Sequence, residues 1–190
     1  IHCHHMSSSG SPLIKSRYLS GSTKLFRVTR GDAHIPFEQG RFEQLLGQLP
    51  EFDVLFVADF GSLFKNESMI KALLIECKNR AIPVVADVQA RGLGASILDI
   101  PEAFCVMPTE KEARLAVNLP NLGLEELGRT LMSRGDFGSL GLTLDEDGLL
   151  VFKSGTSASV AYLPALNRDP VDVSGAGDCR LVYFAMAQLS

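Results

Sequence analysis

The sequence has few of the features that mark metal, nucleic-acid or membrane proteins. Its cysteines show neither metal-ligand spacing nor a paired framework; they are Cys3, Cys77, Cys105 and Cys179. Cys77 and Cys105 lie in apolar patterns typical of buried thiols, so we expect a reducing, cytoplasmic setting. No basic run stands out, the formal net charge is -4, and the apolar runs are too short to span a bilayer. We therefore predict no nucleic-acid partner and no membrane partner.

What the sequence does have is an ordinary globular composition. Its 190 residues are 46% hydrophobic and 21% charged, which is enough for one domain with a substantial core. Residues 1–11 hold three histidines followed by Met, Ser and Gly; they resemble an expression-tag remnant and show no core-forming pattern. We therefore expect a single folded domain over residues 12–190.

Hydrophobic periodicity predicts strands and helices that alternate along most of the chain. Strands are expected at residues 24–30, 53–59, 82–87, 103–107, 140–144 and 149–153. Helices are expected where apolar side chains recur every three or four residues, at 42–49, 70–77, 109–117, 124–132 and 182–189. The alternation from residue 53 onward predicts an α/β fold with a mostly parallel sheet between helix layers.

The stretch "DVSGAGDCR", residues 172–180, lies where a loop leads into a helix. Glycine lets the backbone approach a ligand, and the first amides of a helix have no intrahelical partner. Around Gly175, Ala176 and Gly177, these amides and the helix dipole would form an anion hole for phosphate. Asp178 could accept a proton from a hydroxyl that attacks phosphorus. A plain glycine loop, with an aspartate that only favours the dipole, explains this stretch equally well.

Other stretches, in matching order, resemble the ribokinase-like (PfkB) carbohydrate kinases. They are "VLFVADFG" (54–61), "PVVADVQ" (83–89), "CVMPTEKEA" (105–113) and "LGLTLDEDGLLVF" (140–152), and "DVSGAGDC" (172–179) resembles the signature of the family. Within the family, "TKLFRVTRGDAHIPFE" (23–38) and "ADFGSLF" (58–64) are most similar to the heptose 7-phosphate kinase module of bifunctional heptose kinase/adenylyltransferases.

The resemblance implies a ribokinase-like three-layer sandwich that uses ATP and Mg²⁺. By this resemblance Asp178 is the catalytic base beside the anion hole of residues 175–177. Glu112 matches the glutamate that helps to hold Mg²⁺ through water. Asp59 and Asp87 end two buried strands and would face the substrate, a sugar or sugar phosphate.

Four further positions match the part of the family that lines the nucleotide: Thr109, Thr143, Asp145 and Gly148. Thr109 stands where the family has asparagine, so a hydroxyl replaces the amide's donor and acceptor pair. Asp145 replaces a glycine, and a carboxylate near phosphates is repulsive unless a cation offsets it. A simple hairpin turn is the alternative role for Asp145 and Gly148.

Other departures leave two hypotheses in competition. Ser62 and Gln89 occupy positions near which the heptose kinases have lysines. Arg180, unusual for the family, is interpreted as a surface arginine, with phosphate binding as the alternative. The family's first strands and its later adenine-facing segment have no counterpart, so we expect a truncated module. The first hypothesis is an ATP-dependent sugar kinase that retains the catalytic base Asp178 in a truncated module. The second is a catalytically inactive binding or assembly module. Exposed sheet edges should also favour a homodimer or higher oligomer.

Overall fold

The structure is a computed structural model of the chain, and it describes residues 14–21, 23–30, 39–59, 67–89, 95–155, 159–167 and 175–189. It divides into two compact units, Ile1–Leu49 and Pro50–Ser190, and each is described by itself. The expected tag remnant, residues 1–11, lies outside the described residues. Within the described ranges, no helix combines the length and apolar character needed to cross a membrane.

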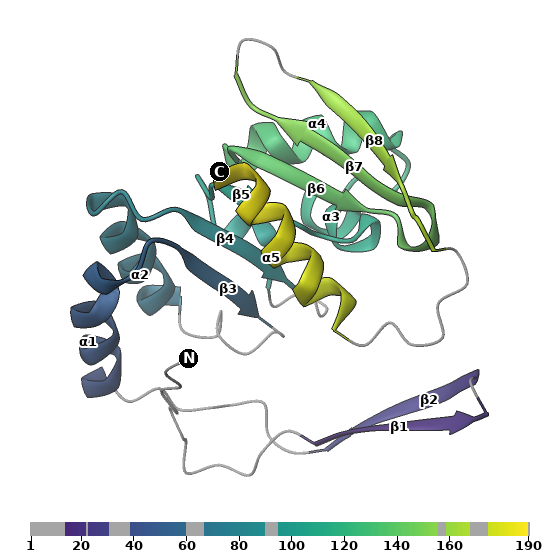
Figure 1. Cartoon of the computed structure of the whole chain (residues 1–190), viewed down its shortest axis with the longest axis horizontal. Helices are drawn as coiled ribbons and strands as arrows, with labels where there is room; N and C mark the ends of the chain where they lie inside the picture. Colours follow the sequence, from purple (N-terminus) through teal and green to yellow (C-terminus); the bar gives the residue numbers. More distant parts are fainter. Residues whose placement is uncertain are drawn as a thin grey trace. The chain divides into compact units, whose positions relative to one another are not determined.

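The first unit contains a hairpin and a helix (Figure 1). Strand β1 (Ile14–Ser20) pairs antiparallel with β2 (Thr23–Arg30), and α1 (Gln39–Gln48) leads into the 3-10 turn η1 (Leu49–Glu51). The rings of Tyr18 and Phe26 stack across the hairpin with centroids 4.5 Å apart, a cross-strand contact that favours this pairing. The sequence predicts β2 and α1 correctly but gives no signal for β1.

The second unit is built on a six-stranded sheet with the order β3-β4-β5-β6-β7-β8. The strands are β3 (Leu55–Asp59), β4 (Val84–Val88), β5 (Cys105–Val106), β6 (Ser139–Thr143), β7 (Gly148–Lys153) and β8 (Val160–Pro164). Strands β3 to β6 are parallel, while β7 and β8 are added by antiparallel pairing. The predicted α/β fold with a mostly parallel sheet is therefore confirmed; β8 was not predicted.

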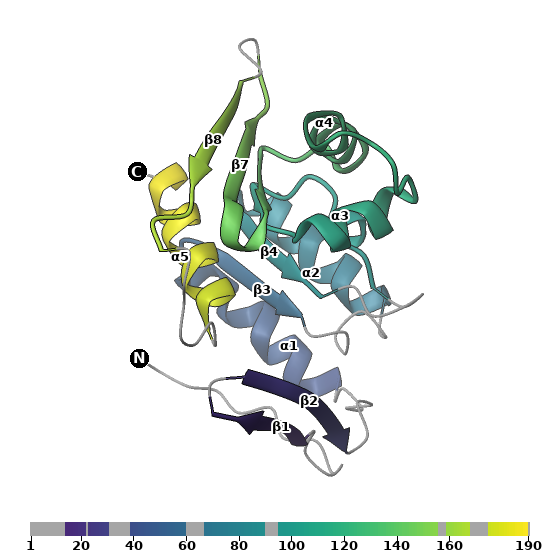
Figure 2. The same cartoon turned by 90° about the vertical axis from the view of Figure 1, so that its right-hand side faces the viewer.

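Helices cover both faces of this sheet. The connections through α2 (Glu67–Asn79), and through α3 (Glu110–Val117) with α4 (Leu124–Gly135), step across the sheet in one direction. Right-handed crossovers in one direction place these helices on the same face. Helix α5 (Ala176–Leu189) covers the other face, as Figure 2 shows with the sheet seen nearly edge-on. The result is a three-layer sandwich.

Helix α5 buries a different stripe from the one that the sequence suggests. The residues 182, 185, 186 and 189 follow a helical period, yet Val182 is 45% exposed and Met186 is 54% exposed. Ala185 of the expected set is buried, but Leu181 is buried in place of Val182, and both pack with Val85 of β4 in the core beneath the helix. Two neighbouring stripes of this helix are apolar, so periodicity alone could not select the one that faces the sheet.

The predicted burial of two thiols is confirmed. Cys77 and Cys105 are free and buried, whereas Cys179 is free and exposed. Burial raises the pKa of the Cys105 thiol to about 11, and the Ser139 hydroxyl opposes this by hydrogen bonding. These two thiols therefore behave as small core residues.

Candidate functional site

The first turn of α5 lies over the carboxyl end of β4. Val85 faces α5 in the core, and side chains alternate along a strand, so Asp87 faces the same helix two residues later. Gly175 has φ +78, a value that favours glycine, and its carbonyl accepts the first helical hydrogen bond from the Cys179 amide at 3.0 Å. A Cβ atom built on Gly177 would lie 3.9 Å from Asp87 Oδ2. The free amides at the start of α5 therefore lie directly above a carboxylate.

Three acidic groups and one cation interact at this point. Burial, and then the charges of Glu112 and Asp178, raise the pKa of Asp87 to about 6, while the charge of Arg180 lowers it. Asp87 is half-buried and Asp178 is exposed on the first turn of α5. The structure thus brings together Asp87, Glu112 and Asp178, which the sequence had assigned to substrate, metal and catalysis.

Glu112 is fixed by the start of its own helix. The Thr109 amide and hydroxyl donate to Glu112 Oε2 at 2.9 and 2.7 Å, and the Glu112 amide donates back to Thr109 Oγ1 at 3.3 Å. This is a capping box, a Thr followed three residues later by Glu. The pattern can be read from the sequence in "TEKE", where Thr109 precedes Glu112 by three residues. Thr109 therefore orients the Glu112 carboxylate.

Thr143 brings a buried hydroxyl to the same face of the sheet. A Cβ built on Gly141 would contact Met107 and Leu149, which both belong to the core cluster beneath α5. Thr143, two residues further along β6, faces the same side, and it forms a bridge to Thr109. Thr143 is only 3% exposed, yet its Oγ1 has no hydrogen-bond partner in the part of the chain that the structure describes. A buried hydroxyl of this kind is suited to a ligand.

The turn between β6 and β7 holds the remaining predicted nucleotide residues. Asp145 begins the 3-10 turn η4 (Asp145–Asp147) and is exposed with φ 50. Gly148 has φ 111, and a Cβ there would lie 2.2 Å from the Leu163 carbonyl oxygen. The turn geometry and the approach of β8 therefore account for Gly148, in agreement with the hairpin alternative.

An open groove of about 890 Å³ runs between this turn and α3. It brings Thr109 and Asp145 together, and Lys111 and Arg114 also line it. Arg114 is engaged within the protein: its guanidinium donates to Glu110 Oε1 and, through one terminal nitrogen, to the carbonyls of Pro120 and Leu122. Lys111 is thus the exposed cation on this wall of the groove.

The structure does not bring Asp59 to the other acids. Ala58 pairs with Asp87 and Asp59 pairs with Val88, so Asp59 faces the opposite side of the sheet from Asp87. Asp59 is buried at 4% exposure, and its carbonyl accepts a hydrogen bond from the Gln89 amide at 2.9 Å. Ser62 lies outside the described residues.

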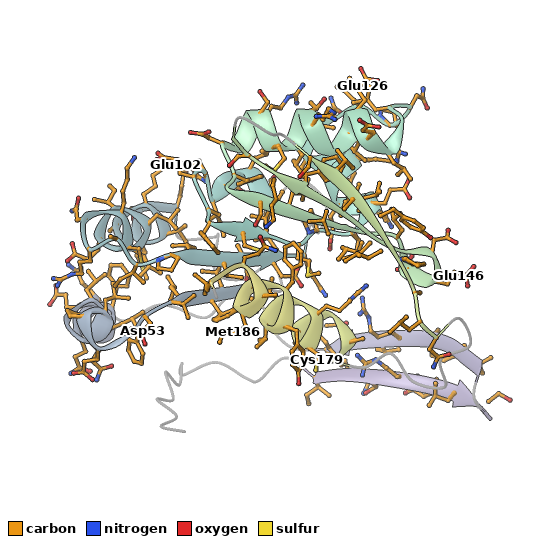
Figure 3. The ribbon with its side chains drawn as sticks, turned by 45° about the horizontal axis from the view of Figure 1, so that its top comes forward. Asp53, Glu102, Glu126, Glu146, Cys179 and Met186 are labelled. Carbon is orange, nitrogen blue, oxygen red and sulfur yellow. The ribbon has the colours of Figure 1, made fainter. Side chains whose placement is uncertain are left out.

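The assembled groups lie at one edge of the sheet. Figure 3 labels Cys179 in the first turn of α5 and Glu146 in the β6–β7 turn, while Asp53 and Glu102 mark the opposite edge, where β3 and β5 begin. The carboxyl edge of parallel strands is where open α/β sheets bind ligands. Among the described residues, no group of three or more His, Cys, Asp or Glu side chains is arranged to hold a metal ion.

Comparison with known proteins supports the resemblance seen in the motifs. No family model matches the chain. It is 26% identical over 180 residues to "Bifunctional protein HldE" of Geobacter metallireducens, an alignment that covers 91% of this chain and 35% of that protein. The chain thus spans about a third of the length of this relative.

Solved structures show the same fold. Ribokinase from Giardia lamblia matches with a TM-score of 0.73 and 15% identity, over 96% of this chain and 56% of that one. Ribokinase from Arabidopsis thaliana, complexed with ribose and ATP, matches with a TM-score of 0.62 and 15% identity, over 85% and 52% of the two chains. The chain therefore has the ribokinase-like fold, matching about half of the length of these ribokinases, and is similar in sequence to bifunctional protein HldE.

Proposed function

We propose that this chain carries the phosphoryl-transfer centre of an ATP-dependent sugar kinase. The observation that carries the proposal is the first turn of α5, where an exposed Asp178 adjoins free helix amides above Asp87. A base for the nucleophile and donors for developing charge are the two requirements of phosphoryl transfer. The fold similarity to a ribokinase complexed with ribose and ATP supports the same class of donor and acceptor.

The reaction follows from these positions. The acceptor hydroxyl oxygen attacks the γ-phosphorus of ATP while Asp178 takes the hydroxyl proton. The bond from the γ-phosphorus to the bridging oxygen breaks, and ADP leaves with the electron pair. The amides of residues 176–178 donate hydrogen bonds to the oxygens of the transferred group, where the negative charge is spread in the transition state.

Mg²⁺ would neutralise part of the phosphate charge. This ion retains several waters and usually takes only one or two protein carboxylates, so it does not need a three-ligand cage. Glu112, oriented by Thr109, and the half-buried Asp87 are oxygen donors of the right kind on neighbouring strand ends. We propose that they hold the ion through water.

Nucleotide binding is proposed for Thr109 and Thr143, which form a bridge at the ends of β5 and β6. The buried Thr143 hydroxyl, which lacks a partner among the described residues, supports this role. Contributions of Asp145 and Gly148 to nucleotide binding, and of Asp59 and Asp87 to substrate binding, stay predictions. The acceptor is proposed to be a sugar phosphate such as heptose 7-phosphate, on the basis of the motif resemblance and the similarity to HldE.

The second candidate is a catalytically inactive binding or assembly module. The capping box favours it, because the fixed Glu112 carboxylate already has a structural role at the start of α3.

The deciding experiment is ATP consumption by this chain with a panel of sugars and sugar phosphates that includes heptose 7-phosphate. Asp178→Asn should lower turnover about 100- to 10,000-fold, since it removes the proton acceptor. Asp136→Asn, an exposed residue at the end of α4, is the matched control and should leave turnover unchanged. Turnover that survives Asp178→Asn would refute the assigned base, and no turnover by the wild type with any acceptor would favour the inactive module.

A further inference from the structure

The proposed site is strongly acidic where it must bind phosphate. The charges of Glu112 and Asp178 both act on Asp87, and the β6–β7 turn adds a run of three acids at Asp145–Asp147. A phosphorylated substrate carries further negative charge, and like charges at short range repel strongly inside a protein. Binding therefore requires a cation that is close to Asp87 and not already engaged.

Among the described residues, Arg180 meets this requirement best. Arg114 donates to Glu110 and to two carbonyls, and Lys111 lies on the outer wall of the groove. Arg180 is the one cation whose charge acts on Asp87, where it opposes the pKa-raising effect of the neighbouring carboxylates.

Helix geometry explains why Arg180 reaches the site. Gly177 lies above Asp87, and at 3.6 residues per turn Asp178 and Arg180 flank it at about 100° and about 60° around the helix axis. The base and the arginine thus stand on either side of the same free amides. Arg180 is half-buried, so part of its side chain is withdrawn from solvent.

The guanidinium has unused hydrogen-bonding capacity. Its Nε atom is buried and has no hydrogen-bond partner within the described ranges. A buried donor without a partner is unfavourable, and a guanidinium offers a planar set of donors that matches phosphate oxygens. Thr143 of β6 provides a second, independent polar atom on the face of the sheet that α5 covers. Its hydroxyl is buried and has no hydrogen-bond partner among the residues that the structure describes.

We propose that Arg180 is a substrate-binding residue that donates hydrogen bonds to phosphate oxygens beside the first turn of α5. The inference rests on the proposed kinase function and assigns the recognition of phosphate at that site to Arg180. Two sources share this chemistry: the phosphate chain of the nucleotide and the phosphate group of a phosphorylated acceptor. Arg180 would also supply positive charge at the site, which the uncharged Ser62 and Gln89 do not supply where the heptose kinases have lysines nearby.

The test is isothermal titration of the full chain with two probes, the magnesium complex of inorganic tripolyphosphate and heptose 7-phosphate. Arg180→Met should weaken the binding of at least one probe about 10-fold or more, because a charge-assisted hydrogen bond is lost. Arg180→Lys, which keeps the charge but not the planar donor set, should weaken it less. The matched control is Arg129→Met, which removes an exposed arginine paired with Glu125 on α4 and should leave both affinities unchanged.

The pattern of loss identifies the source of the phosphate. Weakening confined to tripolyphosphate assigns Arg180 to the nucleotide, and weakening confined to heptose 7-phosphate assigns it to the acceptor. Equal affinities of Arg180→Met and wild type for both probes would overturn the inference, as would a wild type that binds neither. A lowered melting temperature with unchanged affinities would also overturn it, because Arg180 would then be bound within the protein.

The same titrations separate this inference from the kinase proposal. Asp178→Asn should retain binding of both probes while it loses turnover. If Arg180→Met weakens binding but the wild type phosphorylates no sugar, the kinase proposal fails and the role of Arg180 stands. If both affinities are unchanged while Asp178→Asn abolishes turnover, only the role of Arg180 fails.

Discussion

Replacement of Asp87 by asparagine should stabilise the protein at neutral and alkaline pH but not in acid. Burial, Glu112 and Asp178 raise the pKa of this carboxyl from 3.8 to about 6, against the opposing charge of Arg180. A folded-state pKa above the unfolded value means that the folded chain binds the proton more tightly. The contribution of Asp87 to stability is therefore fully present below pH of about 4 and is lost as the pH rises through about 6.

The size of the effect follows from the shift. When the carboxyl is fully ionised, a rise of this size lowers the free energy of unfolding by about 3 kcal/mol. Partial access of the side chain to solvent makes this an upper bound. Asparagine has a similar shape and no charge, so Asp87→Asn should raise the free energy of unfolding by up to this amount at pH 8. At pH 4 the wild-type carboxyl is protonated in the folded state and the difference should nearly vanish.

The assay is urea unfolding of wild type and Asp87→Asn at pH 4, 6 and 8, followed by circular dichroism. The stabilisation by asparagine should grow with pH, most steeply around pH 6. Asp53→Asn, an exposed aspartate at the other edge of the sheet, is the control and should show no such trend (Figure 3). A difference between wild type and Asp87→Asn that is the same at pH 4 and pH 8 would refute the reasoning.

The remaining predictions concern the β6–β7 turn and association. Gly148→Ala should destabilise the protein by more than about 1 kcal/mol, because its Cβ would lie 2.2 Å from the Leu163 carbonyl oxygen and its φ is 111. Urea unfolding measures this, and Gly123→Ala, where a Cβ meets nothing within 4 Å, is the control; equal effects of the two would contradict the prediction. The chain is also proposed to form a homodimer or higher oligomer, since β3 is an edge of the sheet and Tyr183 of α5 is 77% exposed. Multi-angle light scattering checks this, and a monomer at high protein concentration would contradict it.

The sequence predicts the parallel part of the sheet well and its antiparallel edge poorly. The strands β3 and β4 lie within continuously apolar runs, because helices cover both of their faces. Strand β8 has almost wholly exposed side chains, so it carries no clear hydrophobic pattern, and the exposed hairpin strand β1 has the same problem. Such strands are defined by the partner to which they hydrogen bond, which a single sequence does not reveal.

For the candidate site, the sequence suggests residues but not their arrangement, and the roles of these residues stay predictions. Motif resemblance selected Asp87, Glu112 and Asp178, and the structure brings these three together. It also selected Asp59, but the parallel register pairs this residue with Val88 and turns it to the other face. A shift of one residue reverses the direction of a side chain on a strand, and register depends on tertiary pairing. The burial of Arg180 could not be predicted for a related reason, because it depends on how α5 is rotated against the sheet.

The distribution of the site along the chain has a consequence for its biosynthesis. Asp87 lies near the end of β4, Glu112 in the first turn of α3, Thr143 at the end of β6 and Asp178 in the first turn of α5. The ribosome therefore produces these residues in four separate segments, with the proposed base last. The acidic strand ends and the buried hydroxyl are thus made before the helix that supplies the anion-binding amides. Contacts between segments distant in sequence form late in folding, because the intervening chain must first be ordered. A nascent chain released before α5 would therefore have all six strands of the described sheet but would lack the helix on which the proposed phosphoryl-transfer centre depends.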